Sequence, residues 1–184
     1  MPKDNAIGAQ LTLRAPLRSD IELHAALPHS REIHMMYGGD PDFPSVATRA
    51  RSEGWFKWLS AHEYARIIEI DHRAAGEIRL HNVDEEERTA RLAVGFFRES
   101  DLGRGYGRRA IVQALAHGFT EMGLAVIDLR VLDFNTRAIR CYQSCGFETV
   151  ARLPRALRVA GLWHDDLLME ITTERFSDTR NLPA

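Results

Sequence analysis

Glycines and arginines alternate over a short stretch of the chain, at a point where an apolar run gives way to an amphipathic one. The stretch GRGYGRR covers residues 103–109, and the apolar run before it ends at Phe97. A helix that begins here would leave its first backbone N–H groups unpaired, and its dipole would add partial positive charge. Glycines let the backbone approach a phosphate closely, and arginine suits phosphate oxygens. The stretch therefore predicts a pyrophosphate-binding turn between a strand and a helix, with a solvated glycine-rich turn as the alternative.

The spacing of these glycines argues against two common nucleotide-binding motifs. No Gly-Lys-Ser/Thr follows them, so a magnesium nucleoside triphosphate site would lack its lysine and its hydroxyl. The dinucleotide fingerprint requires a different spacing, and its strand begins a βαβ unit, whereas the strand here belongs to a meander. The glycines therefore fit neither motif.

A second chemically distinctive segment, NTRAIRCYQSCGF, covers residues 135–147. It begins with a helix-capping asparagine and ends with a helix-ending glycine. Asn135 and Tyr142 are seven residues apart, which is about two helical turns, so both lie on one face of the predicted helix.

Together the two segments resemble the GNAT acetyltransferases. The resemblance covers about residues 63–170 and rests on RGYGRRA followed, at the family's distance, by NTRAIRCYQSCGF. The closing segment GLWHDDLLMEI is similar to the ribosomal-protein N-terminal acetyltransferase branch. One position departs from the family pattern, because Leu102 stands where the family usually carries Gln or Arg. The resemblance implies a transferase that uses acetyl-CoA as cosubstrate and a primary amine as acceptor, either a protein N-terminus or a small amine.

The resemblance also implies roles for single residues. Tyr142 matches the tyrosine that protonates the leaving thiolate, and the chemistry agrees, because a phenol with a pKa of about 10 is protonated at neutral pH. The positions that match the coenzyme-binding strand, the pyrophosphate loop and the coenzyme-contacting asparagine are Gly95, Phe96, Phe97, Gly103, Arg104, Gly105, Tyr106, Gly107, Arg108 and Asn135. No metal is expected.

The general base is left open between two residues of one predicted strand. An amine must be neutral to attack a thioester, and amines have pKa values of about 8 to 10.4, so a base is useful. Glu77 is the first candidate and His81 the second, and residues four apart on a strand share a face. An ordinary surface or cleft position is the alternative for each. Trp55 and Trp58 are expected to pack in the core, with a wall of the acceptor site as the alternative.

The elements that must position these residues are strands and helices in a mixed order. Helices are expected over residues 19–27, 45–60, 106–122 and 136–145. Strands are expected over residues 11–17, 63–70, 76–83, 89–97 and 124–132, and as a final pair around Ala160-Gly161. A meander followed by a βαβ unit predicts an α/β fold with a mixed sheet and helices on both faces. The GNAT resemblance implies a largely antiparallel sheet with a parallel splayed pair at the coenzyme site. We expect one N-acetyltransferase domain over residues 1–174 and a polar tail over residues 175–184.

Composition narrows the classes of partner. The chain has 184 residues, 45% of them apolar, which is enough for a core, and a net charge of −2, which gives no case for nucleic-acid binding. No window approaches the roughly 20 apolar residues of a membrane span, and we expect a cytoplasmic protein. Cys141 and Cys145 are expected to be reduced thiols. A homodimer is an open alternative to a monomer, and a catalytically inactive CoA-binding sensor or interaction module is the alternative to an enzyme.

Overall fold

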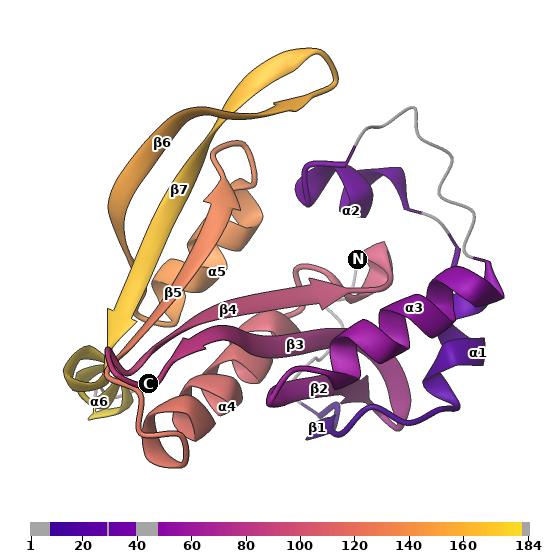
Figure 1. Cartoon of the computed structure of the whole chain (residues 1–184), viewed down its shortest axis with the longest axis horizontal. Helices are drawn as coiled ribbons and strands as arrows, with labels where there is room; N and C mark the ends of the chain where they lie inside the picture. The colour runs from indigo at the N-terminus through magenta and orange to yellow at the C-terminus, as the bar shows by residue number, and fades with distance from the viewer. Residues whose placement is uncertain (1–7, 29, 40–47, 182–184) are drawn as a thin grey trace.

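The computed structural model describes residues 8–28, 30–39 and 48–181 and shows a seven-stranded mixed sheet with helices on both faces (Figure 1). The strand order is β1-β2-β3-β4-β5-β7-β6. The strands are β1 (Leu11–Arg14), β2 (Tyr64–Ile70), β3 (Arg73–Asp84), β4 (Thr89–Phe96), β5 (Val126–Leu132), β6 (Glu148–Val159) and β7 (Leu162–Thr172). The helices are α1 (Asp20–Ala25), α2 (Arg31–Met36), α3 (Arg49–Ser60), α4 (Tyr106–Thr120), α5 (Thr136–Ser144) and α6 (Thr173–Asn181), with a short 3-10 helix η1 (Glu99–Asp101). The predicted fold class is confirmed.

The first four strands form the predicted antiparallel meander. The turn between β2 and β3 is shorter than the sequence suggested, because it consists of Asp71 and His72, which have φ angles of 49° and 62°. Two consecutive residues at positive φ are typical of a tight hairpin turn whose twist matches that of its strands. Strand β3 therefore begins at Arg73, and Gly76 lies inside it.

Strands β4 and β5 run parallel but pair over three residues only, from Thr89 with Val126 to Arg91 with Asp128. Beyond Arg91 both strands continue and diverge (Figure 1). On the other edge of β4, the Phe97 N–H donates to the Ala75 carbonyl at 2.8 Å. Because antiparallel hydrogen bonds alternate along a strand, the backbone groups of Leu92, Val94 and Phe96 point away from β3 and toward the gap. The predicted splayed pair is thus present, and it leaves polar backbone groups unpaired along one edge of β4.

The two faces of the sheet are covered by different helices. Helix α4 buries Ile111, Leu115 and Phe119, which are four residues apart along one side of the helix, against the apolar side chains of β3, β4 and β5. Helix α5 packs on the same side. Helices α1 and α3 cover the other face over β2 and β3, around the fully buried Leu59. Gly118 on α4 sits so close to the sheet that a β-carbon there would lie 2.8 Å from Ile127 Cδ1.

The C-terminal segment differs from the expected polar tail. Residues 173–181 form helix α6, and Phe176 is buried with its ring 5.3 Å from that of Phe119. A single aromatic residue in a polar segment gives almost no periodic signal, although one buried ring is enough to fix a short helix on a core. Helix α2 was also not predicted. The first residues of the helix predicted over residues 45–60, up to residue 47, lie outside the described residues, and α3 begins at Arg49.

The β6–β7 hairpin extends beyond the rest of the sheet (Figure 1). It turns at Ala160-Gly161 as predicted, and it exposes several large apolar side chains, namely Val150, Leu153, Leu157, Leu162 and Trp163. The homodimer stays a prediction. None of the helices in the described part of the chain is long and apolar enough to cross a membrane.

Candidate active site

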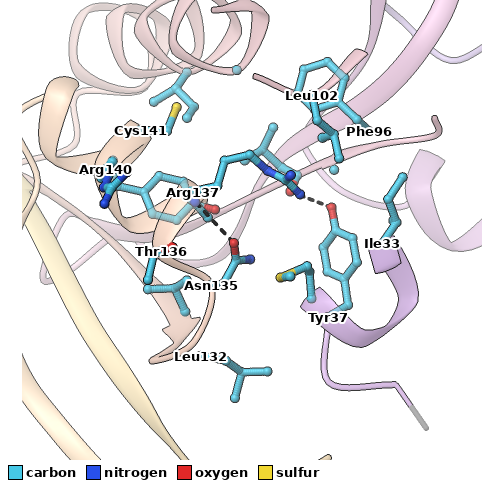
Figure 2. Close-up of a pocket in the computed structure, with 18 of the residues that line it drawn as sticks. Ile33, Tyr37, Phe96, Leu102, Leu132, Asn135, Thr136, Arg137, Arg140 and Cys141 are labelled. Carbon is cyan, nitrogen blue, oxygen red and sulfur yellow. Dashed lines mark hydrogen bonds between the residues drawn. The ribbon is translucent and has the colours of Figure 1, made fainter. Parts of the chain in front are cut away.

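A cavity of about 670 Å³ opens where β4 and β5 separate. Its walls are the ends of these two strands, the first turn of α4 and one side of α5, and α2 lies across it. Figure 2 shows Phe96 and Leu102 on one side of the cavity and Asn135 and Cys141 on another, with Tyr37 facing them. The two segments that the sequence singled out therefore meet at one place.

The loop that leads into α4 leaves backbone donors free. Gly105 is the N-cap, with a φ angle of 79°, and no side chain caps the helix. The first helical bond is that from Arg109 N–H to Gly105 C=O at 3.2 Å, which leaves the N–H groups of the first helical turn, from Tyr106 to Arg108, without a helical partner. An uncapped helix start bordered by glycines fits a pyrophosphate group, as the sequence predicted.

This loop is anchored by an ion pair that sequence reasoning missed. Asp101 is 5% exposed and accepts from both terminal nitrogens of Arg73, at 2.6 and 3.0 Å. The pair joins η1 to the first residue of β3 and so fixes the approach of the chain to α4. The only sequence signal is an aspartate near the glycines, which gives no hint of its partner 28 residues away.

Most of the predicted coenzyme residues line the cavity, and three do not. Those that line it are Gly95, Phe96, Gly103, Gly105, Gly107, Arg108 and Asn135. Arg104 is exposed, and the Tyr106 side chain is buried in the core. Phe97 lies on the other face, where its ring is 6.0 Å from that of Trp55, and its N–H is bonded within the sheet. The backbone groups that point toward the gap are therefore those of Val94 and Phe96, which have no partner within the sheet, instead of those of Gly95 and Phe97.

The backbone around Gly95 is approached closely from two directions. The Tyr37 hydroxyl donates to the Val94 carbonyl at 2.9 Å (Figure 2). A β-carbon on Gly95 would lie 2.1 Å from that hydroxyl oxygen, and a β-carbon on Gly76 would lie 2.2 Å from the Gly95 carbonyl oxygen. Gly76 therefore needs glycine because the atom that confines it is backbone, whereas a β-carbon on Gly95 would require only the end of the Tyr37 side chain to move. Gly103 and Gly105 favour glycine because of their positive φ angles.

Tyr142 lies on α5 and faces the cavity. The start of α5 is fixed by Asn135, whose side-chain oxygen accepts from the Ala138 N–H at 3.2 Å. Burial raises the pKa of Tyr142, and the neighbouring Tyr37, Cys141 and Cys145 add to the effect. Within the described ranges the Tyr142 hydroxyl has no hydrogen-bond partner. Its phenol is therefore protonated and able to donate.

Glu77 lies on β3 directly opposite Gly95 of β4. The Trp55 indole N–H donates to one carboxylate oxygen at 2.5 Å, and Arg79 donates to the other at 3.0 Å. Burial raises the pKa of Glu77, and the Trp55 hydrogen bond and the charges of Arg79 and His62 oppose this rise. The first candidate base is thus next to the stretch of β4 where the strands separate.

His81 shares a face with Glu77, as predicted, but it lies further from the point where β4 and β5 separate. It lies opposite Arg91, where β4 and β5 are still paired. Four residues of strand separate it from Glu77 by roughly 13 Å. Burial is the main cause that lowers the pKa of His81, whose ring is 5.9 Å from that of His62.

The two tryptophans lie beside the Glu77–Arg79 pair and are not among the described residues that line the cavity. Trp55 stacks on His24, with ring centroids 4.1 Å apart, and Trp58 is 45% exposed with Arg79 4.3 Å above its ring. The expectation of core packing is therefore wrong for Trp58 and only partly right for Trp55, which also contacts the cluster around Leu59.

The carboxylates at and near the cavity are paired with arginines. Asp166 lines the cavity, and one of its oxygens lies 2.8 Å from Arg130 Nε. Asp128 lies in the last residue pair of β4 and β5, where one of its oxygens is 2.6 Å from Arg91 Nε. The described residues contain no group of three His, Cys, Asp or Glu side chains that could hold a metal ion.

Comparisons with known proteins agree with this geometry. A family model described as an acetyltransferase (GNAT) domain matches residues 10–148. The chain is 27% identical over 172 residues to spermidine N(1)-acetyltransferase of Vibrio cholerae, covering 92% of this chain and 97% of that protein. The structure of a Vibrio cholerae spermidine N-acetyltransferase in complex with CoA and spermine is similar with a TM-score of 0.76 and 24% identity, over 91% of this chain and 98% of the other. RimJ of Mycobacterium smegmatis, in complex with CoA-disulfide, gives a TM-score of 0.75 at 24% identity, over 89% and 82% of the two chains.

Replacing Gly105 by alanine should weaken CoA binding about tenfold. A residue with a β-carbon pays about 1–2 kcal/mol at positive φ, and relieving that strain would turn the loop N–H groups away from the phosphates. Calorimetric titration with CoA measures the change. The matched control is Gly123→Ala, because Gly123 follows the other end of α4 with a φ angle of 67° and has open space around it. Equal CoA affinity in the two variants would contradict the assignment of the loop.

Proposed function

The chain belongs to the GNAT acetyltransferase family and is an acetyl-CoA-dependent N-acetyltransferase, and from this premise we propose that it acetylates a small, apolar primary amine, with Glu77 as general base and Tyr142 as general acid. One observation carries the proposal. The carboxylate of Glu77 lies on β3 opposite Gly95, at the edge of the gap between β4 and β5, and the phenol of Tyr142 lines the cavity from α5. Acetyl transfer to an amine needs these two groups on opposite sides of the thioester.

The residues of the cavity fit the cosubstrate. The uncapped start of α4 offers N–H groups to the pyrophosphate, and Arg108 lies beside it. The backbone groups of Val94 and Phe96, which have no partner within the sheet, face the gap in which the extended pantetheine arm would lie, as an added strand does at a sheet edge. Acetyl-CoA supplies the activated acetyl group. The Phe96 N–H is positioned to stabilise charge on the acetyl oxygen during transfer.

Glu77 would take the proton that the attacking amine must lose. A base is most effective when its pKa is near the working pH, and burial moves the pKa of Glu77 in that direction, upward from 4.5. Trp55 and Arg79 hold the carboxylate in place beside Gly95. His81, at the paired end of the strands, is the weaker candidate.

Tyr142 would give a proton to the departing sulfur. Its raised pKa keeps the hydroxyl protonated through neutral pH, so the phenol remains an acid over the working range. A thiol is already a fair leaving group, so the contribution of this residue belongs at the lower end of the 10²–10⁴-fold range of general acid–base catalysis.

The walls of the site support a small amine with one charge. Asp101 and Asp166 are the carboxylates among the described residues that line the cavity, and each is bound to an arginine, as is Glu77 beside it. No carboxylate there is spare for a second ammonium group. Aromatic rings lie next to the Glu77–Arg79 pair instead, because Trp55 donates to Glu77 and Arg79 lies over the ring of Trp58. Leu157 of the β6–β7 hairpin contacts Gly38 after α2, which covers the cavity from above. A covered, aromatic site with paired carboxylates suits an apolar amine better than a polyamine or a protein N-terminus.

The Glu77→Gln variant should lose about 10²-fold or more in turnover and lose the acidic limb of its pH–rate profile. Glu77 must be ionised to act, so the activity of the natural enzyme falls as the pH drops through the raised pKa of the carboxyl group. Profiles for two acceptors whose amine pKa values differ identify the limb. A limb of the profile that shifts with the pKa of the amine belongs to the acceptor. If an acidic limb that does not shift remains in the Glu77→Gln variant, Glu77 is not the base.

The Tyr142→Phe variant should lose roughly 10²-fold in kcat while its affinity for acetyl-CoA barely changes, because the hydroxyl acts only in the transition state. Steady-state kinetics and a binding titration measure the two quantities. Tyr64→Phe is the matched control, because Tyr64 is a buried tyrosine at the start of β2 that does not line the cavity. Full turnover without the Tyr142 hydroxyl would return this residue to a packing role.

The acceptor proposal predicts a clear ranking in a thiol-release assay with acetyl-CoA. Phenylethylamine should give a higher kcat/KM than spermidine or a peptide with a free N-terminus. A tenfold preference for spermidine or for the peptide would refute the acceptor class and leave acetyl transfer in place. CoA binding without thiol release for any amine would instead favour a CoA-binding sensor.

A further inference from the structure

Helix α2 lies across the cavity and is attached to the rest of the protein by polar contacts. None of its six residues is buried. Its N-cap Ser30 donates to Glu99 of η1 at 2.5 Å, and Glu32 accepts from Arg137 of α5 at 3.0 Å. Just after the helix, Tyr37 donates to the backbone of β4. The three contacts reach three different walls of the cavity, and an element held this way opens at little cost.

The contact of Tyr37 is with a group that the cosubstrate also needs. Val94 is one of the β4 residues whose backbone points into the gap, so its carbonyl has no partner within the sheet. A carbonyl in such a place requires a donor. In this structure the donor is the Tyr37 hydroxyl, at 2.9 Å. The same hydroxyl occupies the space directly above Gly95, where a β-carbon would be 2.1 Å from it.

We propose, on the basis of the proposed function, that Tyr37 and a pantetheine amide of acetyl-CoA compete for the Val94 carbonyl, and that acetyl-CoA must displace Tyr37 before an amine can reach Glu77. Tyr37 is then the residue that imposes an order of binding, with the cosubstrate first and the acceptor second.

The position of Tyr37 between the two halves of the site supports this role. Burial is the main cause that raises the pKa of Tyr37, and the charge of Glu77 adds to the rise. Tyr37 in turn adds to the rise in the pKa of Tyr142, whose main cause is burial. Tyr37 is therefore within electrostatic reach of both the proposed base and the proposed acid. The end of this side chain lies over Gly95, on the face of the sheet that carries Glu77, so an amine that approaches Gly95 from that face would meet the Tyr37 ring.

The Tyr37→Phe variant tests the competition. It removes the hydroxyl and keeps the ring, and the residue is 60% exposed, so folding should be unaffected. A neutral hydrogen bond contributes a net 0.5–1.5 kcal/mol, so its loss from the free enzyme should tighten acetyl-CoA binding by about 2- to 10-fold. Adenosine 3′,5′-bisphosphate is the control ligand, because it reaches the α4 loop but has no pantetheine arm. Its affinity should be the same for both proteins.

Each result of the two titrations decides between the explanations. Tighter acetyl-CoA with unchanged bisphosphate supports the competition. Unchanged or weaker acetyl-CoA binding in the Tyr37→Phe variant refutes it, and so does an equal change for both ligands, which would mean a general effect on the fold. If the natural protein binds neither ligand, the assignment of the CoA site itself fails.

Discussion

The active site depends on a single constraint, which is that β4 and β5 are hydrogen-bonded over three residue pairs and then part. Parallel strands that stayed paired would satisfy each other's backbone and leave no gap. Because they diverge, the backbone groups of Val94 and Phe96 have no partner within the sheet and must be satisfied by a side chain, water or a ligand. Helices can then bring side chains to the same gap from opposite sides, Tyr142 from α5 and Tyr37 from the end of α2.

The parts of the site that were predictable from the sequence are those encoded locally. The glycines before α4, the capping asparagine and Tyr142 lie on one continuous loop or helix each, and their spacing is enough to place them on one face. Strand β3 also placed Glu77 and His81 correctly on one face. The strand pattern does not predict the register between β3 and β4. That register sets Glu77 opposite Gly95, near the gap, and His81 opposite Arg91, where β4 and β5 are still paired.

The parts that were not predictable are contacts between distant segments. Nothing near Asp101 indicates Arg73, and nothing near Trp55 indicates Glu77, because each pair forms only when the meander is assembled. Tyr37 follows a short helix with no buried residue, so it lacks the apolar periodicity by which helices are recognised. The sequence also does not indicate which residues of β4 turn their backbone groups toward β3. In the structure Gly95 and Phe97 do so, and the groups that face the gap are those of Val94 and Phe96.

The pair of glycines on β3 and β4 has a consequence for how the sequence can vary. Gly76 is confined by the carbonyl of Gly95, and Gly95 by the hydroxyl of Tyr37, so the three positions form a chain of mutual steric dependence. A change at Tyr37 would relax the demand on Gly95, but no change of side chain elsewhere would relax the demand on Gly76, because the atom that confines it belongs to the backbone. Over evolutionary time, Gly95 is therefore free to drift once Tyr37 has been replaced, whereas Gly76 is fixed for as long as β3 and β4 keep their register.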